Sequence, residues 1–334
     1  MKESVLQQLV CPISGQPLTL SGETLEGSEI IGGILDAGDR KYPIIDGVPC
    51  FLDRDQQIAA KQGFTPMWRY RQEGRFESQN IYGVQPERKA GWVVSRYKLP
   101  IEGGEWMLDA GCGSAEMTHA LAKNHPNTQV VGLDFSDAVR ASARVSESVP
   151  NLHFIQADIA NPPFRPGQFR HVLSLGVLHH TPDTHQALAG AAALVSKELL
   201  LWLYPAFGEC FMSDQLYFMR DLHFLGVGHK IHPSLRFKAA KLYSLCMMPA
   251  MTTAYGLYKT LAKLGGPSDD KVFAENMTLQ ELYNTTSFAV FDNISPEHQH
   301  RHAKKQVVGW LRELGFEEVE TDGCGTFTAI RTPV

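Results

Sequence analysis

The chain has 334 residues, 43% of them apolar and 20% charged, a length that suits one large domain with an appendage or two domains. The formal net charge is −5 with no long basic run, which disfavours stable nucleic-acid binding because that needs a concentrated basic face. The six cysteines are scattered without a CxxC pair, so we expect reduced thiols in a cytoplasmic protein.

Neither the start nor the Met-rich region of the chain predicts a membrane segment. The first ten residues, MKESVLQQLV, are too short and too polar for a signal peptide. The uncharged run Leu242–Tyr258 contains Ser, Thr, Pro and Gly and makes a poor bilayer span. We therefore expect a soluble protein with no membrane partner.

The first two hundred residues divide by pattern. Residues 1–55 are Gly-rich and strand-like and predict a small β domain. Residues 56–100 are polar and aromatic with helical stretches, and we expect them to form a helical lid. Between 106 and 204, apolar strands alternate with helical segments, which is the signature of a parallel sheet. The strands are expected at 106–110, 130–134, 152–158, 171–176 and 198–204.

The remainder breaks this alternation. Residues 206–299 carry Phe, Tyr, Leu and Met at helical spacing and predict a helical insertion that covers the substrate. Residues 304–315 predict an amphipathic helix that ends at Gly315, and a hairpin follows. The expected core domain is therefore 101–205 together with 300–334.

The stretch LDAGCGSAE (108–116) ends the first strand of this core and opens a helix. Gly111 and Gly113 permit a tight turn and a close backbone approach to a ligand. A dinucleotide-binding GxGxxG would need a third glycine at Glu116, and a carboxylate there opposes a pyrophosphate. Together with Asp109, it favours a ligand that carries an ammonium group.

Two further acids end the next strands. Asp134 lies 21 residues after Gly113, the spacing at which an acid accepts ribose hydroxyls. Asp158 ends the third strand beside the same crevice. One acid for a ribose and one for an exocyclic amine suit an adenosine without phosphates.

These motifs resemble those of the class I (Rossmann-like) S-adenosylmethionine (SAM)-dependent methyltransferases. LDAGCGSAE looks like their first motif, VVGLDFS their ribose motif, IQADIA their adenine motif and FRHVLSLGVLHHTPD their fourth motif. The resemblance covers about a hundred residues and implies an α/β fold with a seven-stranded sheet, completed by the C-terminal helix and hairpin. It implies SAM as the cofactor, held by Asp109, Gly111, Cys112, Gly113, Asp134, Phe135, Asp158, Ile159 and Leu175.

The tetrapeptide NPPF (161–164) resembles the motif by which amino-group methyltransferases hold the target nitrogen. In those enzymes it ends the fourth strand, whereas here it follows the third. We therefore expect a stiff loop in which Pro162 and Pro163 remove backbone donors and Phe164 packs as an apolar anchor.

Candidate catalysts follow the fourth and fifth strands. Methyl transfer needs the nucleophile to be aligned and, for a hydroxyl, deprotonated. His179 and His180 lie at the mouth of the crevice, and either could be a general base. His180 matches the position that is most often histidine in the family; orientation of the loop by a backbone hydrogen bond is the equal alternative. Tyr204 is a candidate substrate contact or a half-buried strand-end aromatic.

The lid is aromatic, and aromatic faces can shelter a sulfonium by cation–π attraction. Simple packing on the sheet is the alternative for each ring. The candidate lid or substrate contacts are Trp68, Tyr70, Phe76, Tyr82 and His300. We expect no metal, because His298, His300 and His302 lack an evident carboxylate or cysteine partner.

The N-terminal segment resembles the small zinc-ribbon-type proteins that activate tRNA and translation-factor methyltransferases. The likeness rests on LVCPISGQPL and on a YPIxDGxP turn. Ser14 replaces the second cysteine of a CxxC knuckle, so Cys11 stands alone and we expect a metal-free β domain.

The sequence thus predicts a SAM-dependent methyltransferase acting on a small metabolite. One alternative is methylation of RNA or protein. Another is transfer or cyclisation of the aminocarboxypropyl arm of SAM, with release of methylthioadenosine. A SAM-binding regulatory subunit is the non-enzymatic alternative, and a homodimer is left open.

Overall fold

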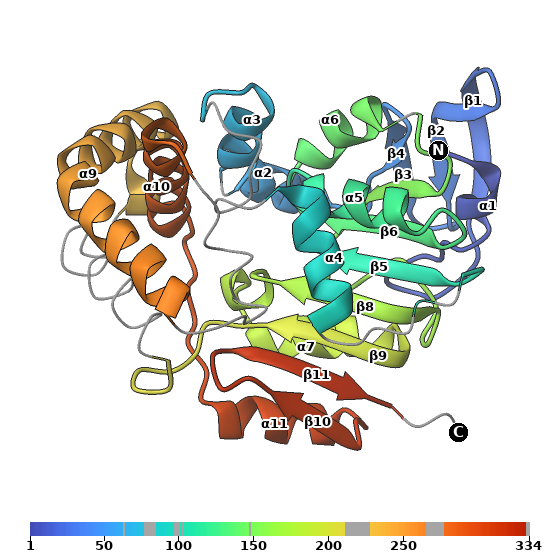
Figure 1. Cartoon of the computed structure of the whole chain (residues 1–334). Coiled ribbons are helices and arrows are strands. Elements are labelled where there is room, and N and C mark those ends of the chain that lie inside the picture. Colours follow the sequence, from blue (N-terminus) through green and yellow to red (C-terminus); the bar gives the residue numbers. More distant parts are fainter. Residues whose placement is uncertain are drawn as a thin grey trace.

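The computed structural model describes residues 1–62, 64–76, 85–96, 101, 103–146, 148–210, 228–264 and 277–331. In this part of the chain two sheets lie side by side (Figure 1). The larger has seven strands in the order β10-β11-β9-β8-β5-β6-β7, and the smaller has the order β1-β2-β3-β4. The prediction of an α/β fold with a seven-stranded Rossmann-like sheet is confirmed.

Five strands of the large sheet are parallel: β5 (Trp106–Ala110), β6 (Gln129–Asp134), β7 (Leu152–Gln156), β8 (Phe169–Leu175) and β9 (Val195–Trp202). The C-terminal hairpin of β10 (Glu318–Thr321) and β11 (Thr326–Ile330) adds β11 antiparallel to β9. The chain runs outward from β5 through β6 and β7, then returns to β8 on the other side of β5. That reversal is the topological switch point at which open α/β sheets bind ligands.

Helices cover both faces of this sheet, so its strands are apolar nearly throughout. The helices α4 (Pro86–Arg96), α5 (Glu116–Asn124) and α6 (Ala138–Val145) lie on one face, and α7 (Thr184–Ala193) and α11 (Lys304–Glu313) on the other. Met107 packs with Ala90 of α4, whereas its neighbour Leu108 belongs to the core that contains Val307 of α11. This alternation follows from the two-residue period of a strand.

The N-terminal unit consists of α1 (Glu3–Leu6), β1 (Thr19–Glu26), β2 (Glu29–Asp36), β3 (Lys41–Ile45) and β4 (Val48–Pro49). Asp46 and Gly47 have φ values of 53° and 74° and make the tight turn between β3 and β4. Immediately afterwards, Cys50 forms a parallel bridge with Gln156 at the edge of the large sheet. The unit therefore covers an edge strand that would otherwise expose unpaired backbone groups.

The NPPF loop also contacts this unit. Phe164 is buried, with its ring 4.9 Å from that of Phe169. The carbonyl of Pro163 accepts a hydrogen bond from the amide of Val10 at 3.0 Å. The expectation that Phe164 is an apolar anchor is confirmed.

The predicted lid, residues 56–100, contains most of α2 (Arg54–Gln62), all of α3 (Thr65–Gln72) and also α4, which instead packs on the sheet. The predicted insertion contains the one-turn η2 (Gly228–Lys230), α9 (Pro233–Leu264) and α10 (Leu279–Ile294). α9 and α10 form a pair of helices beside α3 (Figure 1). Met67 and Phe76 share a buried cluster with Phe288 and Phe291 of α10. The lid and the insertion therefore hold each other by apolar packing. No helix in the described ranges is both long and apolar enough to cross a membrane.

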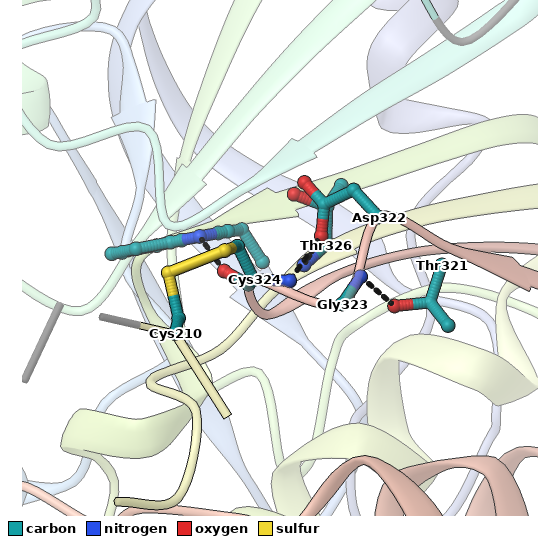
Figure 2. The surroundings of a disulfide bond; sticks show 7 residues. Cys210, Thr321, Asp322, Gly323, Cys324 and Thr326 are labelled. Carbon is teal, nitrogen blue, oxygen red and sulfur yellow. Dashed lines mark hydrogen bonds between the residues drawn. A yellow bond between two sulfur atoms is a disulfide. The ribbon is translucent and has the colours of Figure 1, made fainter. Parts of the chain in front are cut away.

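The expectation of six reduced cysteines is wrong for two of them. Cys210 and Cys324 form a disulfide, with their Cα atoms 5.0 Å apart (Figure 2). It joins the segment after β9 to the β10–β11 turn, where the indole N–H of Trp202 also donates to the Cys324 carbonyl at 3.2 Å. The pair is 114 residues apart in sequence, so no local spacing could indicate it.

Replacing Cys324 by serine should lower the free energy of unfolding by about 2–4 kcal/mol, because the crosslink restricts a long loop in the unfolded chain. Thermal unfolding with and without a thiol reductant measures the effect. Reduced wild type should unfold like Cys324→Ser, while Cys246→Ser, at an exposed free cysteine, should behave like wild type. A wild-type midpoint that reductant leaves unchanged would contradict the prediction.

Candidate functional site

A cavity of about 560 Å³ lies at the carboxyl ends of β5, β6, β7 and β8. Its walls come from the strand ends, from α2 and α3, from the turn after β8 and from the segment that follows α10. The residues that line it are Asp55, Gln56, Ala59, Ala60, Phe64, Trp68, Gly111, Leu133, Asp134, Phe135, Ser136, Ala157, Asp158, Ile159, Gly176, Val177, His180, Thr181, Pro182, Pro296, Glu297 and His298.

The glycine turn after β5 is shaped by close approaches on both sides. Gly111 has φ +93°, and a Cβ there would lie 2.3 Å from both Cγ atoms of Val177. Gly113 has φ +57°, and a Cβ there would lie 2.8 Å from the Trp68 ring. Both positions therefore require glycine for space as well as for backbone conformation. Gly111 lines the cavity, and Gly113 lies beneath the Trp68 ring.

Asp134 is the most strongly bonded acid in the cavity wall. Its Oδ2 accepts the amide of Gly113 at 2.7 Å, and its Oδ1 accepts the amide and hydroxyl of Ser136 at 2.7 and 2.6 Å. Burial raises the pKa of Asp134, and these hydrogen bonds oppose that rise because they favour the charged form. The carboxylate thereby fixes the glycine turn against the end of β6.

Asp158 follows β7 by two residues and lines the cavity. Its Oδ1 accepts the amide of Ala160 at 2.9 Å, and its Oδ2 accepts from the Gln56 side chain at 3.4 Å. Ile159 and Phe135 line the cavity beside it.

His180 lies in η1 (Leu178–His180), at the mouth of the cavity. Its Nδ1 is 2.9 Å from the carbonyl of His298, and its ring is 5.0 Å from that of Phe64. A carbonyl only accepts hydrogen bonds, so Nδ1 carries a proton, and in a neutral imidazole the lone pair is then on Nε2.

His179 and Tyr204 are placed differently and do not line this cavity. His179 is fully buried, and its Nδ1 accepts the backbone amide of Tyr204 at 3.3 Å. The two rings stack with centroids 3.7 Å apart. Burial holds the pKa of His179 well below its usual value. The backbone amide of His300 donates to the His179 carbonyl at 2.9 Å. These residues join the turn after β8 to the C-terminal segment.

Other predicted contacts also lie outside the cavity wall. Asp109 is buried and accepts the Thr118 hydroxyl at 2.6 Å. Burial raises the pKa of the Cys112 thiol well above its usual value, and Leu175 packs against the cluster beneath α4.

The lid aromatics divide into two groups. Trp68 lines the cavity, whereas Tyr70 and Phe76 pack on the insertion, each with its ring 5.2 Å from that of Phe237. Tyr82 lies outside the described residues.

Glu116 does not face the cavity either. It forms an ion pair with Arg71 of the lid and accepts the hydroxyl of Ser114. The acid that sequence spacing assigned to a ligand therefore ties α3 to the start of α5.

Sequence reasoning missed the α2 face, and in the segment after α10 it considered only His298, without placing it in this cavity. Asp55, Gln56, Ala59 and Ala60 lie at helical spacing that is also typical of an ordinary amphipathic helix. Pro296, Glu297 and His298 reach the cavity only because the chain returns there after α10. Neither segment carries a motif that could have identified it.

The sequence of the central part of the chain is similar to that of known proteins. Residues 107–198, from β5 into β9, match the family model described as a methyltransferase domain. This stretch of the chain is therefore similar to a methyltransferase domain.

Curated relatives match part of the chain. Trans-aconitate 2-methyltransferase of Acidovorax ebreus is 44% identical over 87 residues, covering 26% of this chain and 30% of the relative. The protein of that name from Escherichia coli K12 is 28% identical over 127 residues, covering 36% and 49%. The chain thus spans less than half the length of the curated relatives it matches.

Among solved structures, the magnesium protoporphyrin IX methyltransferase of Synechocystis with bound SAM aligns with a TM-score of 0.43. It is 15% identical, over 84% of this chain and 98% of that one.

Replacing Gly111 by alanine should destabilise the fold by about 2–4 kcal/mol, through left-handed strain and a clash with Val177. Gly167 also has positive φ (+68°) but open space around it, so Gly167→Ala should show only the strain, about 1–2 kcal/mol. Urea unfolding compares the two. Adding Val177→Ala to the first variant should recover part of the difference, because the two Cγ contacts at 2.3 Å are removed while the Cβ contact at 2.8 Å remains. Equal losses in both single variants would exclude the clash.

Because of Asp109, the free energy of unfolding should fall as the pH rises. Burial raises its pKa from 3.8 to about 6, so the folded state binds this proton more tightly than the unfolded chain. That contribution is present below pH 4 and is lost as pH rises through about 6. Wild type should therefore lose about 3 kcal/mol relative to Asp109→Asn between pH 4 and 7. Thr118→Val removes a bond to the carboxylate and should extend the loss to higher pH; parallel stability curves would refute the effect.

Proposed function

We propose that the protein is a SAM-dependent methyltransferase that acts on a small molecule. The observation that carries the proposal is the convergence of the glycine turn, two strand-end acids and His180 on one cavity. Its volume of about 560 Å³ lies in the range typical of small-molecule and cofactor sites.

The chain's residues fit SAM group by group. The turn at Gly111 presents backbone to the cavity beside Val177, and a Cβ there would collide with that side chain. Asp134 is placed to accept ribose hydroxyls, since Oδ2 has one protein donor and can take a second. Asp158 suits the exocyclic amine of adenine, with Phe135 and Ile159 beside the ring. When bound, SAM supplies a methyl group on a positively charged sulfonium.

His180 is our candidate for the general base. Its Nδ1 is engaged by the His298 carbonyl, which leaves Nε2 as the atom that takes a proton from a hydroxyl acceptor. His179 is fully buried beneath it and suits a positioning role through its contact with Tyr204. The Phe64 and Trp68 rings extend the wall on the lid side.

The charged residues that line the cavity indicate which charge the methyl acceptor carries. The described lining residues include four carboxylates and no lysine or arginine; the acids are Asp55, Asp134, Asp158 and Glu297. The relatives are named for trans-aconitate, a tricarboxylate, and such an acceptor would be repelled by these acids. We infer that the acceptor here is a neutral or cationic small molecule.

Binding and product analysis test this function. Calorimetry with S-adenosylhomocysteine should show binding. Incubation with SAM and a metabolite extract, followed by separation of the nucleosides, should yield S-adenosylhomocysteine. Methylthioadenosine formed by the protein alone would instead establish the aminocarboxypropyl chemistry, and methyl incorporation into RNA or protein would establish a macromolecular acceptor. A cytoplasmic location and a homodimer stay predictions.

Asp134→Asn should weaken S-adenosylhomocysteine binding by about 10- to 100-fold, because hydrogen bonds to a charged acceptor are lost. Asp183→Asn is the matched control: it makes the same change at the exposed N-cap of α7, outside the cavity. Equal affinities in wild type and Asp134→Asn would contradict the assignment.

His180→Asn should lower kcat by at least about 100-fold for a hydroxyl acceptor, because general-base catalysis contributes about 10²–10⁴. S-adenosylhomocysteine affinity should change little. His119→Asn, on α5 away from the cavity, serves as the control. A kcat that His180→Asn leaves unchanged would show that alignment alone drives transfer.

A further inference from the structure

We propose that Gln56, on the helix that leaves the N-terminal unit, positions Asp158 for recognition of the adenine of SAM. The helix α2 is then part of the cofactor site, and the segment after β4 that pairs with the sheet edge holds it there. This inference rests on the proposed function and adds a residue outside the methyltransferase domain to it.

The N-terminal unit is anchored beside the residue in question. The amide of Phe51 donates to the carbonyl of Gln156 at 2.8 Å, and Cys50 pairs with the same residue. Arg140 of α6 donates to the Gln156 side chain at 2.6 Å. Gln156 precedes Asp158 by two residues, so the anchor fixes the start of α2 against the end of β7.

The orientation of the Gln56 amide is determined by its second contact. Its Oε1 accepts the backbone amide of Asp53 at 3.0 Å, while Oδ1 of Asp53 accepts the backbone amide of Gln56 at 2.8 Å. A backbone amide only donates, so the Gln56 oxygen must face Asp53. The Nε2 group therefore faces Oδ2 of Asp158, at 3.4 Å.

This arrangement holds both oxygens of Asp158. Oδ1 is held by the amide of Ala160 and Oδ2 by Gln56. These two donors fix the orientation of the Asp158 carboxylate, whose oxygens can then accept a further hydrogen bond from an exocyclic amine. A purine with oxygen at that position would meet a carboxylate with no proton to share, and such mismatches discriminate strongly.

The rest of α2 completes the purine wall. Ala59 and Ala60 lie on the same face as Gln56, and their small side chains leave room in the cavity. Ala60 belongs to a buried cluster with Cys50 and Leu52, against which Phe135 packs. The N-terminal unit therefore also supports the aromatic ring at the end of β6.

Calorimetry with S-adenosylhomocysteine and its inosine analogue, S-inosylhomocysteine, tests the inference. Wild type should prefer the adenosine compound. Gln56→Leu should weaken its binding by about 10-fold and reduce the preference, because a hydrogen bond to a charged group is lost. Gln56→Glu should weaken binding further at pH 7.5, because it places a second carboxylate beside Asp158, and should recover at lower pH when the pair shares a proton.

Gln57→Glu is the matched control. The Gln57 side chain donates to the carbonyl of Leu52 at 3.0 Å and does not line the cavity, so both affinities should stay at wild-type values. Far-UV spectra and thermal midpoints establish that the variants fold, and Gln56→Leu keeps the test decisive should Gln56→Glu not fold. Unchanged affinity and preference in a folded Gln56 variant would overturn the inference while leaving the proposed function intact. Wild type that binds neither compound would instead overturn the proposed function.

Discussion

The cavity depends on one buried carboxylate, that of Asp134. It accepts three hydrogen bonds, from Gly113 in the turn after β5 and from Ser136 at the start of the next segment. A charge at this depth is stable only because these donors replace water. The bonds also hold two neighbouring strand ends at a fixed distance. The glycine turn, which Val177 and Trp68 press from either side, is therefore shaped by an acid 21 residues away.

The sequence could predict this part of the molecule because its signals are local. A parallel strand, a tight turn and a helix start each leave their own pattern, and the carboxyl ends of neighbouring parallel strands meet at one edge by geometry alone. Asp134 and Asp158 could thus be placed together without coordinates. Glu116 shows the limit of that reasoning. The motif associated it with a ligand that carries an ammonium group, yet its partner is Arg71 of α3, and no spacing within the motif could show that.

What the sequence could not predict is contact between distant segments. His180 and His298 are 118 residues apart, and only the return of the chain after α10 brings the carbonyl to the imidazole. Cys210 and Cys324 meet because β11 inserts beside β9. Tyr70 and Phe76 have the composition expected of a sulfonium shelter, but apolar rings pack wherever the nearest apolar surface lies, and here that surface is the insertion.

The contact by which the N-terminal unit covers the edge of the large sheet also determines where α2 lies. β7 is the outer strand of the large sheet, and its unpaired backbone groups need a partner or a cover. The segment after β4 supplies one at Gln156, and the chain must then continue from that point. The pairing is at Gln156, two residues before Asp158. The pairing that protects the sheet edge therefore also places α2, the helix that follows, at the mouth of the cavity. A unit that only covered the edge could be followed by a helix in any direction. Here the helix that follows lines the cavity, and the Gln56 side chain donates to Asp158, two residues after β7.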